Sequence, residues 1–115
     1  MKKILVVWPV HREDWIMPFK NLSKDFKFVF LAGIDSKNEK GNYVGSFADT
    51  IYWNDFKDSH EIIKRINPHK IIFMTLESGL NIALNICAKN KGIATYILQH
   101  GIYSNYKDFR NREKI

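Results

Sequence analysis

The stretch "KIIFMTLESGLNIALNICAKNKGIATYIL", residues 70 to 98, decides the fold class of this chain. It begins with "KIIFMT" (70–75), whose successive apolar positions are typical of a strand buried on both faces of a parallel sheet. "IATYIL" (93–98) is predicted to be a second strand, and Gly92 before it is well placed to end a helix. Between the strands, apolar residues recur at helical spacing: Leu80, Ala83, Leu84 and Cys87, widened by Ile82 and Ile86. The order strand, helix, strand predicts a parallel β-α-β unit.

Earlier residues continue this alternation. We expect strands at residues 3–8, 26–33 and 49–53 and helices at about 14–24 and 58–66, with a further helix beginning near Ser104. The first helix has one apolar face: Trp15, Ile16, Phe19 and Leu22. Asp58 and Glu61 have the spacing of a capping box at the start of the second helix. The prediction is one α/β domain over residues 1–115, a three-layer sandwich whose mainly parallel five-stranded sheet has helices on both faces.

The charge of the chain favours anionic partners. The sequence has 18 Lys and Arg against 12 Asp and Glu, a formal charge of +6. The basic residues are spread along the chain, so we expect no nucleic-acid partner and consider a phosphorylated ligand or an acidic membrane surface instead. The one cysteine, Cys87, excludes an internal disulfide and fits a reducing compartment. The start "MKKILVVWPV" is followed by no cleavage site, and no apolar run approaches the ~20 residues of a membrane span, so the prediction is cytoplasmic.

Polar residues follow three of the predicted strands. His11 and Arg12 come after the first strand, Glu77 and Ser78 after the strand at 70–75, and Gln99, His100 and Gly101 after the last. Because parallel strands share a direction, these segments are expected at one edge of the sheet, where open α/β sheets bind ligands. His100 and His11 are therefore candidate catalytic bases, and the candidate substrate-binding residues are Arg12, Glu77, Ser78, Gln99 and Gly101.

Each of these residues also has a purely structural interpretation. His100 and Gly101 could form an ordinary loop, His11 could belong to a charged loop before a helix, and Ser78 could cap a helix beside an exposed Glu77. No GxGxxG or GxxxxGK[ST] motif occurs, and the histidines lack partners at metal-ligand spacing. We therefore predict neither a bound cofactor nor a metal site.

The segment "INPHKIIFMTLESGLNIALNICAKNKGIATYILQHGIY", residues 66–103, resembles the end of the N-terminal Rossmann-like domain of bacterial GT-B glycosyltransferases. The similar group makes capsule and teichoic-acid polymers and includes CDP-glycerol glycerophosphotransferase-like proteins. The shared features are a helix ending at Pro68, a strand, a second helix, and a strand closing in Gln99-His100-Gly101. The opening "KKILVVWP" is similar to the first strand of the same fold.

The resemblance implies an acceptor-binding half of a two-domain transferase. A nucleotide-activated donor would bind mainly to a C-terminal domain that these 115 residues do not contain, so this half alone would be inactive. The acceptor would be lipid-linked or polysaccharide, with peripheral contact at the inner membrane face and no obligatory metal. Some inverting members use a histidine after the first strand as the base, which His11 matches. Pairing of two copies through an uncovered face is a further expectation.

A different function stays open. A flavodoxin-like or receiver-like module would use the same alternation of strands and helices to bind an anionic ligand or a protein partner without catalysis. The two interpretations differ in whether the protein transfers a group or only binds.

Overall fold

The computed structural model describes residues 1–7, 13–33, 47–74, 76 and 79–97. Its strands are β1 (Lys2–Val7), β2 (Phe26–Ala32), β3 (Ala48–Tyr52), β4 (Lys70–Phe73) and β5 (Ala94–Ile97). Its helices are α1 (Glu13–Leu22), α2 (Ser59–Ile66) and α3 (Gly79–Asn90), with a short 3-10 helix, η2 (Trp53–Asp55), before α2. These bounds lie within a few residues of the predicted ones. The helix expected near Ser104 falls outside the described residues.

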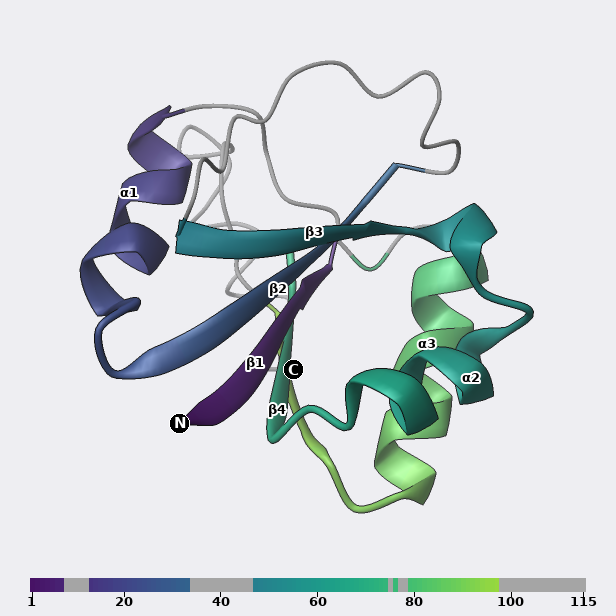
Figure 1. Ribbon diagram of the computed structural model, residues 1–115. Coiled ribbons are helices and arrows are strands. Elements are labelled where there is room, and N and C mark those ends of the chain that lie inside the picture. The colour runs from purple at the N-terminus through teal and green to yellow at the C-terminus, as the bar shows by residue number, and fades with distance from the viewer. Residues whose placement is uncertain (8–12, 34–46, 75, 77–78, 98–115) are drawn as a thin grey trace, which may run out of the picture.

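All five strands are parallel, and they lie in the order β3-β2-β1-β4-β5. Helix α1 covers one side of the sheet, and α2 and α3 cover the other (Figure 1). The predicted α/β sandwich is therefore confirmed, and its strand order is that of the Rossmann fold up to the fifth strand. Flavodoxin-like sheets have the order 2-1-3-4-5, which this sheet does not share.

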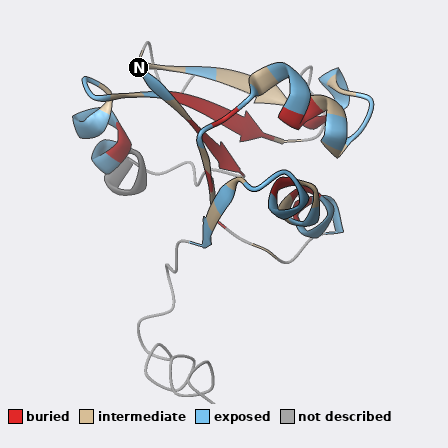
Figure 2. Ribbon diagram, turned by 90° about the horizontal axis from the view of Figure 1, so that it is seen from below, coloured by how far each residue is buried: buried red, intermediate tan, exposed pale blue. Residues whose placement is uncertain are grey.

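Two apolar cores, one on each face of the sheet, follow from the period of the strands. In β1, Ile4 and Val6 pack with Phe19 of α1, whereas Leu5 and Val7 pack against α2 and α3. Successive strand residues point to opposite faces, so a continuous apolar run is what a sheet covered on both sides requires. The buried residues concentrate in the central strands and on the inner sides of the helices (Figure 2).

Helix α2 begins and ends at the capping and terminating residues that the sequence predicts. The Asp58 side chain accepts a 2.9 Å hydrogen bond from the backbone N–H of Glu61, and the Glu61 side chain accepts one from the backbone N–H of Lys57. Asn67 ends the helix in the left-handed region (φ 50°), and its N–H donates to the Ile63 carbonyl at 2.8 Å. Pro68 follows and cannot continue the helix. The predicted cap and stop are confirmed.

Helix α3 ends at a Schellman motif. Gly92 has a φ of 75°, its N–H donates to Lys89, and the N–H of Ile93 donates to Ala88, both at 3.0 Å. Ile93 also packs against the core that contains Ala88, which is the apolar contact usual in this motif. The expectation that Gly92 ends the helix is confirmed.

The predicted apolar faces of α1 and α3 are wrong in detail. Phe19 is buried as expected, but Leu22 is 46% exposed. In α3, Leu80 is 42% exposed, and the fully buried positions are Asn81, Leu84 and Ala88. The buried face of α3 thus includes a polar residue, and the spacing of apolar residues alone predicts a different face.

None of the helices in the described part of the chain combines the length and the apolar composition that crossing a bilayer requires.

Candidate functional site

The carboxyl ends of β1, β4 and β5 form a level edge. Val7 is paired in register with Phe73, and Phe73 is paired with Ile97, so the last residues of the three strands lie side by side. Neighbouring strands are ~4.8 Å apart, which puts all three ends within about 10 Å. The strands that precede the candidate residues in the sequence all end at this short edge.

Strand order reverses between β1 and β4. From β1 the chain proceeds to β2 and β3 on one side of it (Figure 1), and β4 and β5 lie on the other side. In open α/β sheets, ligands bind beyond the carboxyl ends of the strands at the point where the strand order reverses. This topology makes the β1–β4 edge the candidate ligand site.

All seven residues that the sequence singles out lie outside the described residues: His11, Arg12, Glu77, Ser78, Gln99, His100 and Gly101. The structure describes the strands that precede them, and it brings those strands together. Their assignment as catalytic or substrate-binding residues stays a prediction.

The residues at the ends of β1 and β4 are apolar and buried. Val7 and Phe73 are fully buried, and Met74, the next residue after β4, is 2% exposed. The Met74 N–H donates to the Val7 carbonyl at 3.0 Å, so β1 and β4 stay hydrogen-bonded up to their ends. Leu76 packs against the α2–α3 side of the core. Buried apolar residues therefore form the ends of β1 and β4 at this edge.

Asn81 is a polar residue near this edge that the sequence analysis did not single out. It is the third residue of α3, whose first turn follows the end of β4, and its side chain is fully buried. Asn85, one turn later, is half-buried. Two amides four residues apart in an otherwise apolar stretch were the available signal, since that spacing puts both on one side of a helix. Asn81 thus places a buried amide at the start of the helix that follows β4.

Charges near the carboxyl edge are mostly acidic where the structure describes them. Asp55, Asp58 and Glu61 stand at or just before the first turn of α2, where carboxylates stabilise a helix N-terminus. No three His, Cys, Asp or Glu residues in the described ranges come close enough to hold a metal ion.

Comparison with known proteins identifies no family. No model of a protein family matches the chain, and no curated protein matches its sequence.

Proposed function

We propose that this chain is the N-terminal, acceptor-side domain of a GT-B glycosyltransferase or glycerophosphotransferase that builds a cell-surface polysaccharide. The observation that carries the proposal is the order β3-β2-β1-β4-β5 with level ends at Val7, Phe73 and Ile97. In such a sheet, three polar segments separated widely in sequence leave from one edge.

The elements around the resembling segment support the same proposal. Helix α2 stops before Pro68, β4 and α3 follow, and β5 leads directly toward Gln99-His100-Gly101. These elements occur in the order in which the N-terminal domains of GT-B enzymes have them. The strand order also favours a Rossmann-like sheet over a flavodoxin-like or receiver-like one.

The proposed chemistry is deprotonation of an acceptor hydroxyl. His100 or His11 would accept the hydroxyl proton as the acceptor oxygen bonds to the anomeric carbon of a sugar donor, or to the glycerol-bearing phosphorus of CDP-glycerol. The bond from that atom to the phosphate oxygen of the nucleotide would break, and the nucleotide would leave with that oxygen. Arg12 would face the negative charge of the donor or acceptor, and Glu77 and Ser78 would bind acceptor hydroxyls. The donor would be held by a separate C-terminal domain.

The test is a transfer assay with the protein expressed from its entire gene. Nucleotide-activated sugars and CDP-glycerol are offered as donors with lipid-linked acceptors, and release of nucleotide is measured. His100→Ala and His11→Ala are compared with His60→Ala, an exposed histidine of α2. Loss of a general base lowers kcat by about 10²–10⁴-fold, so one of the first two variants should fall by that factor while His60→Ala keeps the wild-type rate.

Two results would contradict different parts of this proposal. Wild-type rates in both His100→Ala and His11→Ala would remove the catalytic assignments. Absence of transfer with every donor, together with saturable binding of an anionic ligand, would favour the stand-alone binding module.

The place of action follows from the proposed acceptor. A lipid-linked acceptor requires work at the cytoplasmic face of the inner membrane, and a formal charge of +6 suits peripheral contact with acidic lipids. Sedimentation of the full-length protein with acidic but not neutral vesicles would support this location.

A further inference from the structure

The amino-terminal edge of the sheet, opposite to the candidate site, contains a hollow of about 480 Å³. It lies where β1 and β4 begin, and its lining includes the basic residues Lys2, Lys3 and His69 beside Ile66 and Asn67 at the end of α2. The residues that line it include no aspartate or glutamate. A hollow with basic residues and no acidic ones favours an anion.

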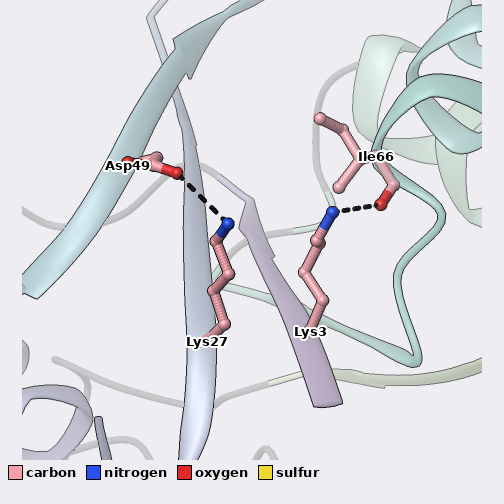
Figure 3. A network of polar contacts seen from close by, with 4 residues as sticks. All are labelled: Lys3, Lys27, Asp49 and Ile66. Carbon is pink, nitrogen blue, oxygen red and sulfur yellow. Dashed lines mark hydrogen bonds and ion pairs between the residues drawn. The ribbon is translucent and has the colours of Figure 1, made fainter. Parts of the chain in front are cut away.

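The ammonium of Lys3 is held in place at this hollow. Its Nζ donates a hydrogen bond to the Ile66 carbonyl oxygen at 2.9 Å, and the side chain is partly buried (Figure 3). An ammonium has three N–H donors, so this contact leaves two for a ligand. The contact also fixes the side chain, which reduces the entropy that a ligand would otherwise have to offset.

Strand pairing fixes the backbone that presents the three basic residues. The His69 N–H donates to the Lys3 carbonyl at 2.7 Å, which ties the start of β4 to the start of β1. Lys2 and His69 are exposed, and an imidazole offers at least one N–H donor in either charge state. Neither residue stands in the last turn of a helix, so stabilisation of a helix terminus does not account for their position.

Further basic residues strengthen the positive potential of this edge. Among the described residues, the connections into β2, β4 and β5 and the first positions of these strands contain four more lysines, Lys24, Lys27, Lys70 and Lys91, and Lys89 stands in the last turn of α3. The acidic residues there are Asp25 and, at the start of β3, Asp49, which lies 3.9 Å from the Lys27 ammonium (Figure 3). Surplus positive charge at one edge attracts anions over several ångströms.

We propose that this hollow is a binding site for a phosphate-bearing anion of diphosphate size. Lys2, Lys3 and His69 donate to its oxygens. A volume of about 480 Å³ lies within the range of small-molecule sites, and several donors match the several charged oxygens of a diphosphate. The site lies at the opposite edge from the proposed transferase site and does not depend on it.

The test uses pyrophosphate as the probe, titrated into the protein with any tag at its C-terminus and followed by calorimetry at low salt. Lys2→Gln/His69→Gln is compared with Lys57→Gln, which removes an exposed lysine just before α2, at the other edge. Each charge-assisted hydrogen bond lost weakens binding by about tenfold, so the double variant should bind at least that much more weakly. Lys57→Gln should stay within about twofold of wild type. Thermal unfolding of each variant checks that the substitutions leave the fold intact.

Vesicles distinguish a free anion from a lipid headgroup. One result is that the wild-type protein sediments with phosphatidylglycerol vesicles, that pyrophosphate inhibits this binding, and that the double variant lacks it. That result would identify a lipid headgroup as the source of the bound anion. Pyrophosphate binding without vesicle binding would identify a free ligand. No pyrophosphate binding at millimolar concentration, or equal weakening in Lys57→Gln, would overturn the proposal.

Discussion

The ammonium of Lys3 donates a hydrogen bond to the carbonyl oxygen of Ile66, and the two atoms are 2.9 Å apart. The bond joins the start of β1 to the end of α2, which are 63 positions apart in the chain. The last carbonyls of a helix lack intrahelical partners and carry partial negative charge. A cation there donates a hydrogen bond to such a carbonyl and interacts favourably with the charge. Part of the basic character of this edge thus stabilises the fold.

Replacement of Lys3 by methionine should therefore destabilise the protein. Lys3→Met keeps most of the apolar stem and removes the donor, and we expect the free energy of unfolding to fall by about 1–2 kcal/mol. Lys2→Met is the matched control, because Lys2 is exposed on the same strand and should change stability by less than about 0.5 kcal/mol. Urea unfolding of both variants measures the difference, and equal effects would contradict a specific role for the contact with Ile66.

The Asp58 cap of α2 gives a second prediction. Its carboxylate accepts from the Glu61 N–H at 2.9 Å, and Asp58→Ala should lower the free energy of unfolding by about 1 kcal/mol. Asp58→Asn keeps an acceptor at the same position and should lose only a few tenths of that amount, which separates capping from charge. If asparagine were as costly as alanine in chemical denaturation, the hydrogen bond would not be the source of the stabilisation.

Gly92 gives a third prediction, based on backbone conformation alone. A Cβ at this position would meet no atom within 4 Å, but a φ of 75° is unfavourable for any residue with a side chain. Gly92→Ala should cost about 1 kcal/mol. Gly79→Ala is the control, since its Cβ also enters open space and its position is the first of a helix, where alanine is favoured. The melting temperature should fall for the first variant and stay level or rise for the second.

Local signals in the sequence predicted most of the elements, because these signals act over a few residues. Asp58, Asn67-Pro68 and Gly92 mark helix ends by hydrogen bonding and backbone preference, and both are readable from neighbouring residues. The apolar runs of β1 and β4 indicated strands covered on both faces, and the two cores confirm this.

Strand order could not be predicted in the same way. All the buried strands are apolar on both faces, so their composition does not say which pair is adjacent. That β4 rather than β3 lies beside β1 depends on the path of the chain across the sheet, which is a property of the whole fold. The candidate site depends on the same fact, because His11 and His100 follow strands with only β4 between them.

Helix α3 shows where apolar spacing fails, and it supplies the last prediction. The spacing indicates Leu80 and Leu84 on one buried face, yet Leu80 is 42% exposed and Leu84 is fully buried. The buried face of this helix includes a polar residue, Asn81, whereas several apolar residues lie on the exposed face. Apolar spacing alone therefore does not identify the buried face.

The two leucines allow a matched comparison, since each substitution removes the same atoms from the same helix. Leu84→Ala should lower the free energy of unfolding by about 2–5 kcal/mol, because it leaves a cavity between α3 and the sheet. Leu80→Ala should cost less than about 1 kcal/mol, since a half-exposed side chain loses little burial and alanine is a better helix former. Urea denaturation measures both losses, with one common m-value, the slope of the free energy of unfolding against urea concentration, fitted to the two variants. Equal losses would mean that α3 is rotated toward the face that the spacing indicated, with Leu80 in the core.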